Sequence, residues 1–317
     1  MYKPSLSLKL KVLKTVAETR LKKRPLSITL ELTRRCNAKC DYCNHWKEQK
    51  QEEQELAEYV AVVRRFQPFT VTICGGEPFM RRDAMDIIRA VKNAEGWRYM
   101  SIITNGWFLT DQRCKELVET GIDQINISLN WPDERQDEDR KIKGLFKRME
   151  HVVPYLVSLG ANVQMNSILM NDNLDDCVNI AKLADKWGAS VMFTLYSELP
   201  GENHDHLFPK ERWPKLRQVV AELKKTKNVL NAGWYFDMIP GYVEGTVIPG
   251  CTAGKETLHI SPGGMVRPCA ELPPVSHYTE YDHNAQPWTT CTACFQACRG
   301  EVQAPINLDR VVQMLSM

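Results

Sequence analysis

The sequence has no long apolar run, almost no net charge and no internal repeat. Its 317 residues include 41 Lys or Arg and 39 Asp or Glu, a formal net charge of +2, so no overall field favours nucleic acid as a partner. No apolar stretch is long enough for a signal peptide or a membrane span. These absences predict a globular protein of a reducing cytoplasm.

Cysteine, in contrast, is abundant, with 11 residues. In a protein without an export signal, many thiols favour metal ligation over disulfide bonds. Three of them lie within eight residues, at Cys36, Cys40 and Cys43. Three thiols can hold three corners of a four-iron cube and leave the fourth iron open to another ligand. The alternatives are a zinc knuckle completed by His45, or three unrelated buried thiols.

Six short apolar runs alternate with helical patterns, such as the stripe Leu56, Tyr59, Val63 and Phe66. This alternation predicts βαβ units with a parallel sheet, and hence an α/β fold. We expect a partial (β/α)6 barrel of the TIM type with its helices outside. The six expected strands are 28–32, 69–74, 99–104, 123–129, 162–169 and 190–196.

Polar residues alternate with apolar ones in the fourth and fifth of these runs. Asn126, Ser128 and Asn130 belong to one, and Gln164 and Asn166 to the other. Because the apolar set should face the helices, the polar set should point into the barrel. Six strands leave an accessible lumen, so these residues either contact a ligand or satisfy one another and buried water.

The amino terminus is basic and amphipathic. Residues 1–24 hold eight Lys or Arg and one acid, and a helix is expected after Pro4, with Leu6, Leu10, Leu13, Ala17 and Leu21 at helical spacing. Such a helix either packs its apolar stripe on the domain body or lies in the headgroup region of a membrane, in contact with lipid.

From about residue 228, Gly and Pro punctuate short segments. We expect a hairpin of 257–261 with 265–267, and a last helix at about 306–315. The expected parts are therefore an amino-terminal helix (1–24), a partial barrel (25–227) and a small Cys-rich domain (228–317).

A Gly-Gly-Glu-Pro turn, Gly75 to Pro78, follows the second apolar run. Adjacent glycines let backbone approach a ligand closely, and barrel active sites form at the carboxyl ends of the strands. With the cysteine triplet one βα unit earlier, the chain resembles the radical S-adenosylmethionine (SAM) superfamily. The resemblance implies a SAM-binding 4Fe-4S cluster on the triplet, with SAM cleaved to a 5′-deoxyadenosyl radical that abstracts hydrogen.

The same resemblance implies a set of cofactor-binding residues near the ends of the first strands. One departure concerns Asn130, which stands where the superfamily usually has an acid. The expected SAM contacts are Gly75, Gly76, Glu77, Pro78, Thr104, Asn105, Ser128, Asn130 and Asn166.

The carboxyl-terminal cysteines resemble the auxiliary-cluster extensions called twitch and SPASM. Only five are present, which fits the one-cluster twitch form and implies a second 4Fe-4S cluster. The expected ligands are Cys251, Cys269, Cys291 and Cys294, with Cys298 able to replace either of the last two. A structural zinc is the alternative. Arg267, Arg299 and Glu301 lie close by in the sequence, where they could tune the charge of the site.

Tyr196 and Glu198 follow the sixth strand, where catalytic residues of barrels collect, and are the candidate catalytic residues. His204 and His206 belong to a polar loop that forms either a metal or proton-relay site or a solvated turn. The remaining thiols, Cys74, Cys114 and Cys177, are expected to be structural.

The favoured function is a radical enzyme acting on a small metabolite, with the auxiliary cluster aiding electron transfer or substrate positioning. Flavodoxin or ferredoxin would be the electron donor. One alternative is a maturase of ribosomal peptides, although such enzymes often carry a leader-binding domain and none fits before residue 28. Another is a non-catalytic iron-sulfur or zinc-binding scaffold, which would not need the Gly-Gly-Glu-Pro turn.

Overall fold

The computed structural model describes residues 5–48, 52–285 and 289–305. Its sheet follows the order β6-β5-β4-β3-β2-β1-β7-β8-β9, with β1 to β7 parallel and β8 and β9 antiparallel. The strands are β1 Ser27–Glu31, β2 Thr70–Cys74, β3 Tyr99–Thr104, β4 Gln124–Ser128, β5 Val163–Leu169, β6 Ser190–Leu195, β7 Thr257–Ile260, β8 Met265–Arg267 and β9 Ser276–His277. The first six match the expected strands, and the α/β class is confirmed.

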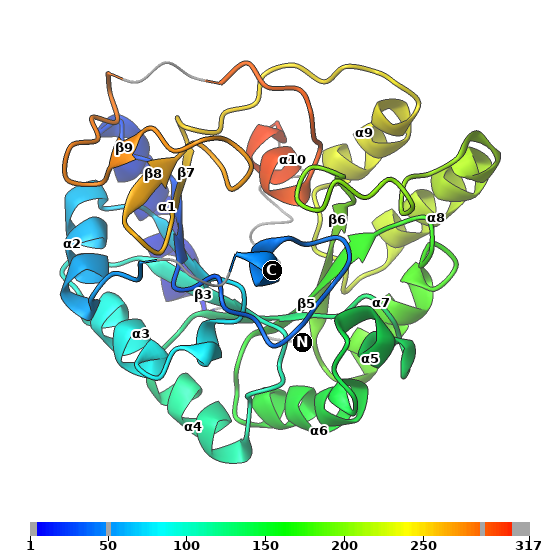
Figure 1. Ribbon diagram of the computed structural model, residues 1–317, viewed down its shortest axis with the longest axis horizontal. Coiled ribbons are helices and arrows are strands. Elements are labelled where there is room, and N and C mark those ends of the chain that lie inside the picture. The colour runs from blue at the N-terminus through cyan, green and yellow to red at the C-terminus, as the bar shows by residue number, and fades with distance from the viewer. Residues whose placement is uncertain (1–4, 49–51, 286–288, 306–317) are drawn as a thin grey trace.

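Most helices lie on the outside of the curved sheet, as α2, α3, α4 and α6 do in Figure 1. The helices are α1 Leu6–Leu21, α2 Leu56–Phe66, α3 Ala84–Asn93, α4 Asp111–Glu119, α5 Arg135–Arg140, α6 Leu145–Ser158, α7 Cys177–Lys186, α8 Trp213–Lys225, α9 Gly233–Val243 and α10 Ala297–Gln303, with 3-10 turns η1 His45–Lys47, η2 Pro78–Met80 and η3 Lys210–Arg212. Their apolar stripes, such as Tyr59, Val63 and Phe66 on α2, are buried. The hydrophobic core lies between these helices and the sheet.

The two faces of the strands divide as the alternation predicts. Ile125 and Ile127 of β4 are buried among the apolar core residues. On the other parity, Gln124 Nε2 donates to Gln164 Oε1 (3.0 Å), and Gln164 Nε2 donates to Asn166 Oδ1 (2.8 Å). The polar side chains on this parity therefore partly satisfy one another.

The carboxyl-terminal segment extends the sheet. The expected hairpin is confirmed as β7 and β8, but β7 also pairs in parallel with β1 and makes a seventh parallel strand that the sequence did not predict. In Figure 1, β9 lies beside β8 at one end of the sheet, and α10 lies near β6 at the other end. The expected helix at 306–315 lies outside the described residues.

Helix α1 begins after Pro4 as expected, and Ser5 Oγ caps it by accepting from Leu8 N (3.2 Å). The interpretation that its Leu6 stripe packs on the body is wrong. Leu6, Leu10, Leu13 and Leu21 are 72%, 58%, 46% and 83% exposed. The reason is a second stripe on the opposite side of the helix, which takes the body-facing position: Leu8, Val12, Thr15, Val16 and Thr19 are half-buried or buried.

None of the helices in the described part of the chain combines the length and the apolar character needed to cross a membrane.

Candidate active site

The cysteine triplet lies in the loop that follows β1, which arches over the centre of the strand ring in Figure 1. Tyr42, between the second and third cysteines, is buried and its hydroxyl donates to Asp139 Oδ2 (2.7 Å). Trp46 Nε1 donates to the backbone oxygen of Cys40 (2.9 Å). The loop is thus anchored by side chains on both sides of the thiols.

The three thiols differ in their surroundings. Burial raises the pKa of Cys36 to about 12 and also raises that of Cys40. Burial would raise the pKa of Cys43 as well, but the hydrogen bond and charge of His45, whose Nδ1 lies 3.4 Å from the Cys43 sulfur, lower it below the ordinary value. Arg140 Nη1 lies 3.6 Å from the Cys40 sulfur. Two basic side chains, His45 and Arg140, therefore lie beside the thiols.

The Gly-Gly-Glu-Pro turn packs directly on the segment that leads to the triplet. A Cβ atom on Gly75 would lie 2.5 Å from the Thr33 backbone oxygen, and one on Gly76 would lie 2.4 Å from that of Arg35. Gly76 N also donates to Thr33 O (2.7 Å), and Glu77 N to Arg35 O (2.9 Å). Only glycine allows this approach, so these residues fix the turn to the cysteine loop.

Glu77 is fully buried at this junction, with Pro78 beginning the turn η2 behind it. Its carboxylate accepts from Thr104 Oγ1 (2.8 Å), from Asn105 N (2.8 Å) and from Phe79 N (3.3 Å). Burial nevertheless raises its pKa to about 7. Within the described residues no Lys, Arg or His forms an ion pair with it, so this carboxylate fits a ligand that carries a cation, such as an amino group.

Thr104 and Asn105, at the end of β3, join the turn to the cysteine loop. Both residues contact Glu77. In addition, Asn105 Nδ2 donates to Oδ1 of Asn37 (2.8 Å), the residue that directly follows the first cysteine. Ser128 ends β4 and is the register partner of Asn166 in the middle of β5, and both are half-buried. Four neighbouring parallel strands, β2 to β5, thus carry the expected cofactor-binding residues, most of them at the carboxyl ends of the strands.

Asn130 is completely buried, and its side-chain amide forms hydrogen bonds within the protein. Its Nδ2 donates to Tyr42 OH (2.8 Å) and to Asp139 Oδ2 (3.1 Å), while its Oδ1 accepts from Ile168 N (2.9 Å). An acid at this position would face Asp139. The departure from the superfamily pattern therefore has a local physical reason, and contact of Asn130 with SAM stays a prediction.

The two candidate catalytic residues lie in the loop after β6. The Tyr196 hydroxyl donates to Asn203 O (2.7 Å), and burial raises its pKa to about 12. Glu198 Oε2 lies 2.5 Å from His204 Nδ1 at the surface. Both side chains stabilise the loop itself, and their contact with a substrate stays a prediction.

His206, in the same loop, joins two other loops. Its Nδ1 lies 2.6 Å from Asp172 Oδ2 and its Nε2 lies 3.2 Å from Asp41 Oδ1, within the cysteine triplet. Burial alone would lower its pKa, but Asp172 and Asp41 raise it. His206 is therefore a buried bridge rather than a solvated loop residue.

Sequence reasoning missed a buried charge cluster centred on Glu31, the last residue of β1. Its Oε2 lies 3.0 Å from His259 Nε2 on β7, and its Oε1 lies 3.1 Å from His45 Nε2. Arg34 Nε lies 3.3 Å from the same carboxylate. The signal available in the sequence was an acid inside an otherwise apolar strand next to the triplet.

The five carboxyl-terminal thiols influence one another electrostatically. Burial raises the pKa of Cys269, and the charge of Cys294 raises it further; burial likewise raises that of Cys298, with added effects of Cys294, Cys269 and Cys251. Arg299 Nη1 donates to Cys294 O. No group of three or more His, Cys, Asp or Glu in the described ranges is preset to hold a metal ion. The thiols share a neighbourhood whose ligand set stays a prediction.

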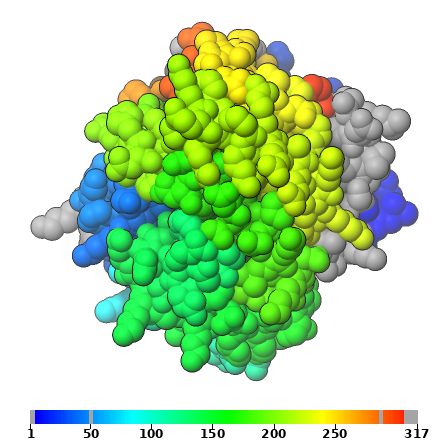
Figure 2. Space-filling view, turned by 90° about the vertical axis from the view of Figure 1, so that its right-hand side faces the viewer, coloured from blue at the N-terminus to red at the C-terminus, as the bar shows by residue number. Residues whose placement is uncertain are grey.

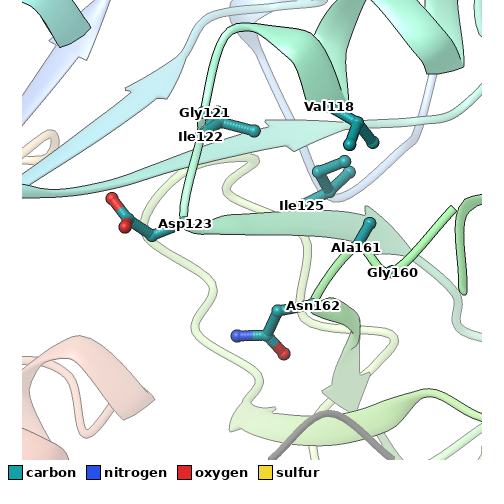
Figure 3. Close-up of a pocket in the computed structure, with 8 residues that line it drawn as sticks. All are labelled: Val118, Gly121, Ile122, Asp123, Ile125, Gly160, Ala161 and Asn162. Atoms are coloured by element: carbon teal, nitrogen blue, oxygen red, sulfur yellow. The ribbon is translucent and has the colours of Figure 1, made fainter. Parts of the chain in front are cut away.

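Cys74, Cys114 and Cys177 belong to neither set of thiols in the sequence. Cys114 and Cys177 are fully buried on helices, as expected of structural residues, and Cys74 ends β2. Figure 3 shows a small pocket between Asp123, Asn162 and their neighbours. It lies at the amino ends of β4 and β5, the edge opposite the cysteine loop, so it does not belong to the site.

The residue types at this site match the chemistry of the cofactors that the triplet predicts. Three thiols with adjacent cationic groups suit an iron-sulfur cluster, and a buried Glu77 without a cationic partner suits the amino group of SAM. When bound, such a pair supplies a carbon radical that abstracts hydrogen. The chain itself orients the loop through Tyr42 and Asn105.

Comparisons with known proteins agree with this geometry. The family model of the Radical SAM superfamily matches residues 30–184. The PqqA peptide cyclase of Methylocella silvestris is 27% identical over 87% of this chain and 77% of its own length, and the GTP 3′,8-cyclase of Aquifex aeolicus is 30% identical over 59% and 61%. SuiB of Streptococcus suis, solved with SAM bound, has the same fold, with a TM-score of 0.67 at 15% identity over 86% of this chain and 68% of its own.

The matched region includes the cysteine triplet, the Gly-Gly-Glu-Pro turn and the carboxyl ends of the first five strands. Residues 30–184 therefore form a domain of the radical SAM superfamily.

Proposed function

We propose that this radical SAM enzyme modifies a ribosomally made peptide. The observation that carries the proposal is the extent of the PqqA peptide cyclase relatives. Two of them, at 27% and 28% identity, align with 87% and 80% of the chain. These alignments reach well past the superfamily domain, so they favour the maturase alternative over the small-metabolite interpretation.

In this proposal Cys36, Cys40 and Cys43 hold a 4Fe-4S cluster, and Glu77 binds the amino group of SAM. The peptide side chain enters the lumen, where Asn126 Oδ1 is buried and has no hydrogen-bond partner among the described residues. Such an atom needs a donor from a ligand or water. The carboxyl-terminal thiols would hold an auxiliary cluster, which would supply an electron acceptor.

A second candidate is a radical reaction on a nucleotide or another small metabolite. It is supported by the GTP 3′,8-cyclase relatives, one of them 30% identical over 199 residues. That alignment covers 59% of the chain, less than the peptide cyclase alignments cover.

The first experiment tests the radical chemistry. Anaerobically reconstituted protein should hold about eight irons and, once reduced with SAM present, release 5′-deoxyadenosine. The Cys36, Cys40 and Cys43 triple Ala variant should keep about four irons and release none. Protein that binds only zinc, or that is fully loaded with iron yet never cleaves SAM, would exclude a radical enzyme.

The second experiment tests the substrate. A peptide encoded beside the gene for this chain is incubated with reduced enzyme and SAM, and GTP is tested in a parallel reaction. A peptide product that has lost hydrogen, formed only when SAM is cleaved, supports the first candidate. Consumption of GTP with an unchanged peptide would replace it by the second.

A further inference from the structure

Helix α1 carries two apolar stripes on opposite sides. The half-buried one begins at Leu8 and the exposed one at Leu6, two positions apart, which is more than half a turn of an α-helix. Each stripe continues at helical spacing over the length of α1. One side is thus committed to the protein body, and the other presents leucines to the outside.

The attachment to the body is at the amino-terminal edge of the barrel. Lys11 Nζ lies 4.9 Å from the ring centre of Trp97, just before β3, and Arg20 Nη2 lies 3.9 Å from Glu256 Oε1, just before β7. The cysteine loop leaves the opposite edge of the sheet. In Figure 2 the dark-blue atoms of α1 lie at one edge of the molecule and the lighter blue of the segment after β1 at the other.

The exposed stripe is bordered by cations. By helical position, Lys9 and Arg20 lie along one side of it and Lys14 along the other. Lys22 and Lys23 follow directly and are exposed. Within residues 5–24 the single acid is Glu18, whose carboxylate lies 3.9 Å from Lys14 Nζ.

We propose that this face of α1 docks the enzyme on an anionic lipid surface. A helix with an apolar stripe between cationic borders lies in the plane of the headgroups, with its leucines among the acyl chains and its Lys and Arg at the phosphates. The charge complementarity selects anionic lipid over a neutral surface. Because α1 crosses the edge of the barrel opposite the cysteine loop, the docked enzyme turns its active site away from the membrane.

The test is flotation of the reconstituted enzyme with lipid vesicles. One set contains phosphatidylcholine alone, and the other contains phosphatidylcholine mixed with phosphatidylglycerol. The wild type should bind the anionic vesicles at least about ten-fold better than the neutral ones, and added salt should release it. Equal binding to both, or no binding to the anionic set, would overturn the proposal.

The test variant is Leu10→Glu with Leu13→Glu, which places two charges on the exposed stripe. Its matched control is Gln218→Glu with Ala221→Glu on the exposed side of α8, which changes the net charge equally and elsewhere. The stripe variant should lose vesicle binding and keep SAM cleavage, while the control keeps both. Wild-type binding by the stripe variant contradicts the proposal, and Lys9→Gln with Lys14→Gln provides a second variant should the first not fold.

Other occupants of the stripe give different results, each of which would replace lipid docking. A second copy of the chain would appear as a dimer in light scattering that the stripe variant dissociates. A peptide partner would appear as a raised KM for peptide in the stripe variant without vesicle binding by the wild type. An occupant within the chain would appear as a lowered Tm of the stripe variant alone.

Discussion

Glu31 and His259 are 228 residues apart in the sequence, and their side chains meet at 3.0 Å inside the barrel. This contact joins the strand that leads to the cysteine triplet to the strand that begins the carboxyl-terminal hairpin. Burial raises the pKa of Glu271, two residues after Cys269, and the charges of His45 and His259 partly offset this rise. The charge cluster around Glu31 therefore lies near both the triplet segment and the segment that carries Cys269.

Glu31→Gln should destabilise the protein by about 2 to 4 kcal/mol, because it removes the buried carboxylate that the imidazoles of His45 and His259 share. Burial would raise the pKa of Glu31, but the hydrogen bonds of His259 and His45 lower it below 4.5. A carboxyl group whose pKa is lower in the folded state stabilises the fold above its unfolded pKa. The difference in the free energy of unfolding between variant and wild type should therefore be largest near pH 7 and shrink as the pH falls below 4.5.

Denaturant unfolding across this pH range measures the effect. The matched control is Asp111→Asn, because Asp111 also pairs with a histidine, His151 (2.7 Å), but at the surface. We expect a loss of less than about 1 kcal/mol there. Equal losses in both variants would mean that burial of the Glu31 cluster has no energetic consequence.

Gly76→Ala should separate the Gly-Gly-Glu-Pro turn from the cysteine loop, since the new methyl group would meet the Arg34 and Arg35 backbone oxygens at 2.6 and 2.4 Å. We expect destabilisation of about 1 to 3 kcal/mol and a loss of SAM affinity larger than that of stability. Isothermal titration of reconstituted enzyme with SAM measures the affinity. Gly263→Ala is the control, because the atoms nearest to its Cβ lie at 3.6 Å or more; a similar loss of affinity there would refute the explanation.

The part of the site that could be predicted from the sequence is the part defined by motifs of neighbouring residues. The triplet, the Gly-Gly-Glu-Pro turn and the ends of the parallel strands follow from spacing, because consecutive βα units bring such ends to one edge. The Glu31 to His259 contact could not be predicted, since it depends on β7 pairing with β1 across 200 residues of chain. The exposed stripe of α1 was misjudged for a related reason: a helix with two apolar sides leaves the choice between them to the tertiary structure.

Asn130→Asp should destabilise the protein by about 2 to 4 kcal/mol, even though it restores the acid usual in the superfamily. The new carboxylate loses the donor to Tyr42 and Asp139 and lies beside a second buried carboxylate. Thermal unfolding measures the loss. Combining it with Asp139→Asn returns a donor to the pair and should recover most of the stability, whereas additive losses would argue against direct coupling.

Cys294→Ala combined with Cys298→Ala should lower the iron content of reconstituted protein by about four atoms, and Cys298→Ala alone should leave it unchanged. This difference follows from the expectation that Cys251, Cys269, Cys291 and Cys294 are the ligands and that Cys298 can replace Cys294. Iron analysis and the absorbance of the clusters measure it. Iron loss in Cys298→Ala alone would make Cys298 the ligand, and full iron content in the double variant would reject an auxiliary cluster on these thiols.

SAM binding should weaken as the pH falls through about 7, because the pKa of Glu77 is raised to about 7 by burial and its protonated form cannot pair with the amino group. Since the ionised form binds, affinity should fall about ten-fold for each pH unit below that value and level off above it. Glu77→Gln should bind weakly at every pH, without this slope. Thr104→Ser, which keeps the hydroxyl that donates to Glu77, should keep the wild-type profile. A slope that survives in Glu77→Gln would assign the proton to another group and leave Glu77 with a structural role.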